Sequence, residues 1–266
     1  MRRCLIECAA CGYQASPTAG TVFDRTRLPL PLWFRAIWLV TSDKSGVSAL
    51  SLQRQLGLKR YETAWMMLHK LRRAMVRPGR DRLSGRVEVD ETYVGGEEEG
   101  VRGRGTVTKT LVAVAAEENG SKIGRIRLAA ISDVSGRSLL QFVQQSIEVG
   151  SVVHTDGWKG YGVVTERGYR HEVTNIHQTG KRGHEVMPRV HIVASLLKRW
   201  LVGTHHGGIQ PAHLDYYLDE FTFRFNRRTS RSRGKLFYRL IQQAVQVEPV
   251  RWSEISKPLK KREHNM

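Results

Sequence analysis

The sequence has little cysteine and no long apolar run. These two features argue against a disulfide-stapled protein and against a membrane-spanning protein. Its three cysteines, Cys4, Cys8 and Cys11, lie at the start of a 266-residue chain, so disulfides cannot staple the fold. Apolar runs fall well short of the roughly 18 residues that a membrane-spanning helix needs. The N-terminal segment carries Glu7 and the cysteines directly after two arginines, which makes a poor signal peptide. We therefore expect a cytoplasmic protein with no membrane partner.

Acidic residues are also scarce relative to basic ones. The chain has 43 Lys and Arg against 25 Asp and Glu, a net charge of +18, and the excess is concentrated in residues 225–266. Such an excess predicts a polyanionic partner, because each phosphate neutralised by Lys or Arg releases counterions. The expected partner is nucleic acid, and the alternatives are a ribosome-associated or merely basic soluble protein.

Residues 1–26 contain one half of a zinc ribbon. Cys8 and Cys11 form a CxxC knuckle followed by Gly12 and Tyr13, a pattern that aims two thiolates at one metal. Together with Cys4 they are candidate Zn²⁺ ligands. A structural zinc site needs four ligands, so the alternative is a remnant with free cysteines.

Residues 27–80 are expected to be helical. A proline-led apolar stripe covers 31–40, a short helix covers 49–56 after a serine cap, and Gly57 separates it from a helix over 60–77. This outline is typical of a helix-turn-helix DNA-binding region, although other three-helix bundles share it. The candidate DNA contacts are Lys59, Arg60, Tyr61, Thr63 and Lys70, with His69 beside them.

From Gly85 the periodicity changes to that of strands. Strands are expected at 86–94, 111–116, 125–131, 151–155 and 169–173, and helices at 138–147, 189–202 and 211–226. Residues 95–105 are expected to form a mobile hairpin loop. The order predicts an α/β domain over 84–230, followed by a basic tail over 231–266.

The predicted elements place one aspartate within a strand and another directly after a strand. Asp90 lies in the first strand and Asp156 follows a later one, so their carboxylates can converge on one point. Carboxylates are the ligands that Mg²⁺ prefers, and paired metal ions can clamp the oxygens of a phosphoryl transfer. Glu88 and Glu91 compete with Asp90 as first ligand. Pleat alternation puts Glu88 on the face of Asp90 and Glu91 on the other.

Several blocks resemble DDE-type transposases of bacterial insertion sequences in the ISXO-like group. These blocks are Val87–Gly96, His154–Tyr161, Val190–Gly207 and Tyr217–Arg228. The resemblance covers nearly the whole chain, and it implies an RNase-H-like catalytic core, Mg²⁺ dependence and element-end DNA as substrate. Members of the group begin with more of the zinc ribbon, so a truncated N-terminus is expected here.

The third metal ligand is less clear, because related sequences often carry Asn where Leu196 stands. The group commonly places its third acid and a basic residue seven positions apart, and His191 and Lys198 have this spacing on one helical face. His191 is therefore the expected third ligand and Lys198 a phosphate contact. Glu185 and Glu220 are the rivals. The expected cofactor is Mg²⁺ or Mn²⁺, and because imidazole is a softer ligand than carboxylate, we expect the site to favour Mn²⁺ more than an all-acid site would.

The resemblance implies that the chain is a transposase that cleaves insertion-sequence ends and joins them to target DNA. Arg227 and Arg228 would add DNA contacts, and pairing of two ends implies at least a homodimer. The alternatives are an inactive DNA-binding protein, decayed or domesticated, and an RNase-H-like nuclease without strand transfer.

Overall fold

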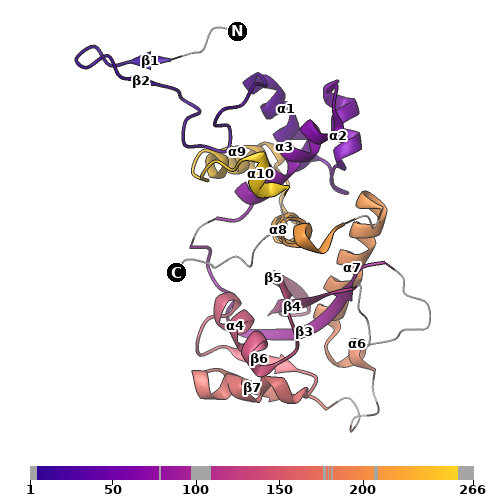
Figure 1. The fold of residues 1–266 in the computed structure, drawn as a ribbon. Coiled ribbons are helices and arrows are strands. Elements are labelled where there is room, and N and C mark those ends of the chain that lie inside the picture. Colours follow the sequence, from indigo (N-terminus) through magenta and orange to yellow (C-terminus); the bar gives the residue numbers. More distant parts are fainter. Residues whose placement is uncertain are drawn as a thin grey trace. The chain divides into compact units, whose positions relative to one another are not determined.

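The chain divides into two compact units in the computed structural model (Figure 1), which describes residues 5–77, 79–96, 109–175, 178, 180, 182–206 and 209–256. The first unit combines residues 1–78 with 230–266, and the second spans 79–229. No helix in these described ranges has the length and hydropathy to cross a membrane.

The first unit begins with a small hairpin and continues as helices. Strands β1 (Ile6–Glu7) and β2 (Gln14–Ala15) pair antiparallel, and helices α1 (Leu30–Ser42), α2 (Ala49–Leu56) and α3 (Tyr61–Ala74) follow. The Ser48 hydroxyl accepts a hydrogen bond from the Ser51 N–H, and Gly57 ends α2 in the left-handed conformation. The predicted helices on either side of Gly57 are thus confirmed.

The C-terminal segment that the sequence predicted as a basic tail contains two helices, α9 (Arg233–Ala244) and α10 (Trp252–Ile255). The Phe237 ring lies 6.0 Å from Trp38 of α1, and Trp252 lies 5.6 Å from Trp65 of α3. Leu236, Leu240 and Ala244 form a buried stripe at helical spacing. The basic residues between these positions obscured this periodicity in the sequence.

The second unit is built on a five-stranded mixed sheet. Its strands are β3 (Arg86–Val94), β4 (Thr110–Asn119), β5 (Lys122–Ile131), β6 (Val152–Thr155) and β7 (Arg170–Val173), in the order β5-β4-β3-β6-β7. The pairs β3–β4 and β4–β5 are antiparallel, while β6 lies parallel to both β3 and β7. The helices are α4 (Gly136–Ser146), η2 (Lys159–Arg167), α6 (Gly183–Val186), α7 (Pro188–His205), η3 (Pro211–His213) and α8 (Leu214–Phe225).

Alternation along β4 divides the core into two layers. Val112, Val114 and Ala116 pack with α7 and α8, whereas Ala113 and Ala115 pack with α4 and η2. The sheet is therefore covered on both faces, which confirms the predicted α/β class. Helix α7 continues past its predicted end at Gly203 to His205. Apart from Gly95 and Gly96, the expected loop at 95–105 lies outside the described residues.

Strand β5 is one of the two edge strands of the sheet, and residues of α8 and its C-cap bind the backbone of β5. The Asn226 side chain accepts from the Ile126 N–H at 2.7 Å and donates to its carbonyl at 3.2 Å, and the Asp215 carboxylate accepts from the Ala130 N–H. These side chains satisfy backbone groups that an exposed edge strand would present to other chains.

A buried carboxylate in β4 offers a test of this architecture. Burial raises the pKa of Glu117, but hydrogen bonds from the Arg125 side chain and from the Ser84 and Arg125 N–H groups outweigh it, so the pKa lies below its usual value. We predict that Glu117→Gln lowers the free energy of unfolding by about 1.5–3 kcal/mol at pH 7 in urea titrations.

A group with a lowered folded-state pKa stabilises the fold above its unfolded pKa, and this contribution disappears as pH falls through the folded value. The difference in the free energy of unfolding between wild type and Glu117→Gln should therefore become smaller below about pH 4.5. Glu166→Gln, on an exposed side chain of η2, is the control and should leave stability unchanged. A difference in the free energy of unfolding that grows toward low pH would contradict a lowered pKa of Glu117.

Candidate active site

Asp90 and Asp156 lie on neighbouring parallel strands. Glu88 of β3 is paired with His154 of β6, and two residues further along each chain come Asp90 and Asp156. Adjacent strands lie roughly 4.8 Å apart, so matching positions on one face bring their side chains together. Asp156, directly after β6, is fixed by accepting the Trp158 N–H at 3.0 Å. The structure thus brings the two predicted aspartates together.

The environment of Asp90 is that of a crowded acidic site. Burial raises its pKa, the Glu91 N–H and His191 lower it, and the negative charges of Asp156 and Glu88 raise it again, with a net increase. Like charges this close disfavour ionisation of all of them at once. A bound cation would relieve this repulsion.

Helix α7 brings His191 and Lys198 to the same place. The His191 Nε2 atom lies 3.8 Å from Asp90 Oδ2, and it is buried with no hydrogen-bond partner among the residues that the structure describes. Partial burial and the charge of Lys109 lower the pKa of Lys198, whereas Asp90 raises it, so Lys198 also lies within electrostatic reach. The spacing of seven therefore places both side chains toward Asp90, and their chemical roles stay predictions.

The side chains of Asp90 and His191 suit a divalent metal ion. A buried imidazole nitrogen without a partner, aimed at a carboxylate, is costly unless something binds it. A separation of 3.8 Å also suits two ligands that each lie about 2.1 Å from one ion. Asp90 and His191 would thus hold a divalent ion, and Asp156 stays a predicted further ligand.

Glu88 is not an open ligand, because it caps helix α7 from the neighbouring strand. Its Oε2 atom accepts from the N–H groups of Arg189 at 2.8 Å and Val190 at 3.0 Å, and Oε1 accepts from the Arg189 guanidinium at 2.8 Å. Helix α7 begins at Pro188 and has no side-chain cap of its own. Glu88 therefore replaces the missing cap and fixes the turn that carries His191.

Glu91 points to the opposite face of the sheet, as the pleat predicts. Its carboxylate accepts a hydrogen bond from the Tyr161 hydroxyl, in the layer formed by α4 and η2. Burial and the nearby carboxylate of Glu91 raise the pKa of Tyr161 well above its usual value, so the hydroxyl stays a donor. Of the three acids in β3, Asp90 is the one directed at both Asp156 and His191.

A second cluster lies near the start of β3. Ligand atoms of Glu88, Glu118 and His154 come within 4.8 Å of one another. Arg189 already bridges the two carboxylates at 2.8 and 3.3 Å, and Arg86 forms a further ion pair with Glu118. Because these guanidinium groups supply the positive charge that a metal ion would bring, we infer that the cluster stabilises the fold and does not bind a metal.

The rival third ligands are held by local partners. Exposed Glu185 accepts from the Arg182 N–H at 2.6 Å, and fully buried Glu220 accepts from the Arg224 side chain at 2.8 Å. Leu196 is 36% exposed on another face of α7.

The residues expected to contact DNA through α3 differ in exposure. Three of them are exposed at the start of the helix: Lys59, Arg60 and Tyr61. Thr63 is partly buried. Lys70 is only 9% exposed and donates to the Val22 carbonyl at 3.3 Å, so the prediction that it contacts DNA is corrected. His69 is fully buried and stacks against Trp65.

Arg227 and Arg228 also make contacts within the second unit. Their guanidinium groups lie 4.0 Å from the ring centres of Phe223 and Phe225, respectively. Arg227 donates to the Phe223 carbonyl, and Arg228 donates to carbonyls of Phe225, Gly124 and Ile123. These contacts join α8 to β5, a structural role that the basic composition did not reveal.

The cysteine knuckle forms the turn between β1 and β2. Hydrogen bonds from the Cys11 and Ala10 N–H groups and from the Cys11 side chain lower the pKa of Cys8, which favours its thiolate. Cys8 and Cys11 are exposed and unbridged, and Cys4 lies outside the described residues. Zinc binding stays a prediction.

Comparison with known proteins identifies the chain as a transposase and gives its family. Residues 82–226, which include every residue of the candidate centre, match the ISXO2-like transposase domain. The chain therefore belongs to the ISXO2-like transposase family. A protein in the transposable element ISH50 of Halobacterium salinarum is 29% identical over 245 residues, covering 86% of this chain and 80% of that protein.

Solved structures of Mos1 transposase show weak similarity. Its paired-end complex with the left transposon end is 11% identical, covers 83% of this chain and 81% of that chain, and has a TM-score of 0.32. A pre-cleavage Mos1 transpososome also has a TM-score of 0.32, at 12% identity with 83% and 80% covered.

The different roles of Glu88 and Asp90 lead to a stability prediction. We expect Glu88→Gln to lower the free energy of unfolding by about 1–3 kcal/mol, because it weakens the bonds to the α7 N-terminus and leaves Arg189 without its carboxylate. The neighbouring control, Asp90→Asn, should cause no loss, because it removes a charge that burial and nearby acids disfavour. A larger loss for Asp90→Asn than for Glu88→Gln in urea titrations would reverse these roles.

Proposed function

We propose that this chain is a DDE-type transposase that cleaves DNA at the ends of an insertion sequence and joins the freed ends to target DNA. The observation that carries the proposal is the contact of Asp90 with His191 of α7, with Asp156 brought near Asp90 by the pairing of β3 and β6, within a chain of the ISXO2-like family. The order of three antiparallel strands followed by two parallel ones supports an RNase-H-like core over 84–230.

The residues suit two successive phosphoryl transfers. Divalent ions, when bound there, supply positive charge that stabilises in-line displacement at phosphorus. Asp90 and Asp156 act as carboxylate ligands, His191 acts as a ligand through Nε2, and Lys198 contacts a non-bridging phosphate oxygen. In cleavage, a water oxygen forms a bond to phosphorus and the 3′-oxygen leaves with a proton. In joining, that 3′-oxygen forms a bond to a phosphorus of the target strand, the 3′-oxygen of the target leaves and takes up the proton that the attacking hydroxyl loses, and no covalent enzyme intermediate is required.

DNA binding is assigned to the first unit. Helices α2 and α3, joined through Gly57, have the outline of a helix-turn-helix, and the exposed residues Lys59 and Arg60 lead into α3, which begins at exposed Tyr61. The net charge of +18 supports phosphate contacts more generally. Pairing of two element ends implies at least a dimer, which would act on DNA in the cytoplasm.

The first experiment is a cleavage and strand-transfer assay in Mg²⁺ and in Mn²⁺, on DNA from the flanks of the gene. We expect Asp156→Asn and His191→Ala each to reduce joined products at least about 100-fold, because each removes a metal ligand. His191→Asp should restore part of the Mg²⁺ activity, since it supplies an oxygen ligand. His184→Ala, on the exposed helix α6, is the matched histidine control.

The outcomes separate the candidate functions. Joining that survives His191→Ala would move the third ligand elsewhere. Cleavage by wild type without joined products would make the protein a nuclease. DNA binding without cleavage would make it an inactive DNA-binding protein.

DNA binding by α3 is tested separately by titrating end DNA at several salt concentrations. Lys59→Ala and Arg60→Ala should each weaken binding and reduce the slope of log affinity against log salt by about 0.9 for each phosphate that the side chain neutralises. Lys44→Ala, an exposed lysine between α1 and α2, is the control. An equal effect of Lys44→Ala would assign the binding to overall charge instead of to α3.

A further inference from the structure

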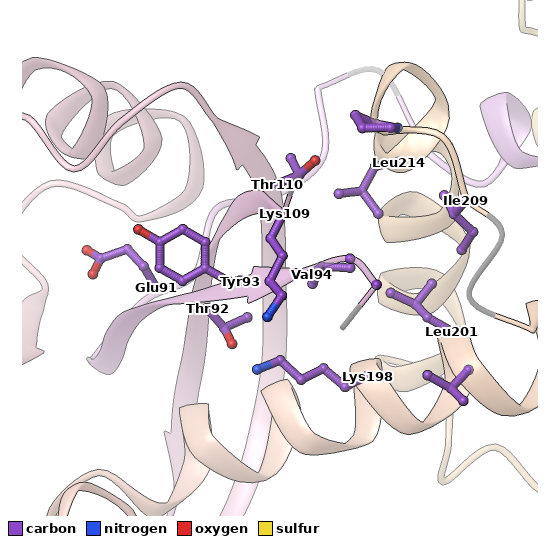
Figure 2. Close-up of a pocket in the computed structure, with 14 residues that line it drawn as sticks. Glu91, Thr92, Tyr93, Val94, Lys109, Thr110, Lys198, Leu201, Ile209 and Leu214 are labelled. Carbon is purple, nitrogen blue, oxygen red and sulfur yellow. The ribbon is translucent and has the colours of Figure 1, made fainter. Parts of the chain in front are cut away.

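A pocket of about 610 Å³ adjoins the candidate centre within the second unit (Figure 2). Strand β3 contributes Thr92, which has the same face as Asp90, and α7 contributes Lys198 and Val202, which continue the stripe that begins at His191. The pocket is therefore the direct extension of the candidate centre along both elements. The mechanism proposed above leaves most of this space unused.

One side of the pocket is cationic. Lys109 and Lys198 point their amino groups into the same space (Figure 2), and the charge of Lys109 lowers the pKa of Lys198. The end of β3 packs directly on this side, since a Cβ atom at Gly95 would lie 3.0 Å from the Lys109 Cα atom. Two ammonium groups so placed repel each other, and an anion between them would turn this repulsion into attraction.

The other side of the pocket is apolar. Its wall consists of Val94, Leu201, Val202, Ile209 and Leu214. Leu201 and Leu214 belong to the buried core, with Val94 and Ile209 packed against them, so the wall is firmly supported. A cationic side facing an apolar wall matches a nucleotide, which has an anionic phosphate and a flat base.

We propose that this pocket binds one nucleotide of the DNA strand next to the phosphate under attack. Its phosphate lies between Lys109 and Lys198, and its base is unstacked against Val94 and Ile209. The volume falls within the range of small-molecule pockets, and a nucleotide can be accommodated outside the base stack in a protein pocket at a cost of a few kcal/mol, as enzymes that modify bases show. The proposal rests on the proposed function, because it requires end DNA at the neighbouring centre.

The test uses the full chain and end DNA that carries 2-aminopurine at successive positions around the cleavage site. Fluorescence is measured on binding in Ca²⁺, so the readout does not depend on catalysis. We expect a several-fold increase at one position, which reports an unstacked base. Lys109→Ala should remove most of this increase and weaken binding roughly tenfold, and Lys109→Arg should restore both. Lys122→Ala, an exposed lysine of β5, is the control.

Two further comparisons separate pocket occupancy from loss of structure. Val202→Glu should repel the nucleotide, whereas Val149→Glu carries the same charge change at a comparable exposure, 65% against 60%, and lies outside the pocket lining. Ile209→Trp fills the pocket, so it should impair cleavage of intact DNA but not of DNA whose unstacked nucleotide lacks its base.

Wild-type binding and cleavage without a fluorescence increase at any position would overturn the pocket proposal and leave the transposase proposal standing. Equal effects of Val202→Glu and Val149→Glu would also overturn it. A fluorescence increase that depends on Lys109, in a protein that never cleaves end DNA, would uphold the pocket and reject the transposase activity.

Discussion

The candidate centre depends on one buried interaction, in which the Glu88 carboxylate holds the first N–H groups of helix α7 against strand β3. From this contact the two elements run alongside each other. Four residues of strand, from Glu88 to Thr92, cover about 13 Å, and eight residues of helix, from Val190 to Lys198, cover about 12 Å. Because the two lengths match, the residues that β3 directs to one side lie along the face of α7 that is directed at the sheet. Asp90 thus meets His191, and Thr92 and Lys198 line the same pocket.

Charge divides the acids on this face into two groups. At the start of β3, Arg86 and Arg189 neutralise Glu88 and Glu118, and a buried ion pair of this kind becomes costly when one partner is removed. Further along β3, Asp90 meets another carboxylate and a histidine, and its pKa is raised. The same face therefore has a neutralised structural end and an acidic end that favours a cation. Position along the strand, and not the residue type, separates the two roles.

Local patterns in the sequence predicted much of this arrangement. Alternation assigned Glu88 and Asp90 to one face and Glu91 to the other, and a spacing of seven placed His191 and Lys198 on one side of a helix. Interactions between distant residues were not predictable. Glu88 and Arg189 are 101 positions apart, and two of the carbonyls that Arg228 binds, those of Ile123 and Gly124, lie in β5, more than 100 positions away. Lys70 resembled other basic residues of its helix, and only the packing of Val22 above it showed that it is buried.

Helix geometry also bears on the unusual leucine of α7. Successive residues rotate by about 100° around a helix, so Lys198 lies within about 20° of His191, whereas Leu196 lies about 140° away from it. The exposed side chains of Ile192 and Leu196 follow this second direction, and the buried core positions Val193 and Leu197 follow a third. A side chain at 196 is therefore directed away from the carboxylate that His191 faces. On this geometry, His191 is the side chain of α7 that faces Asp90, and leucine at 196 leaves that contact unchanged.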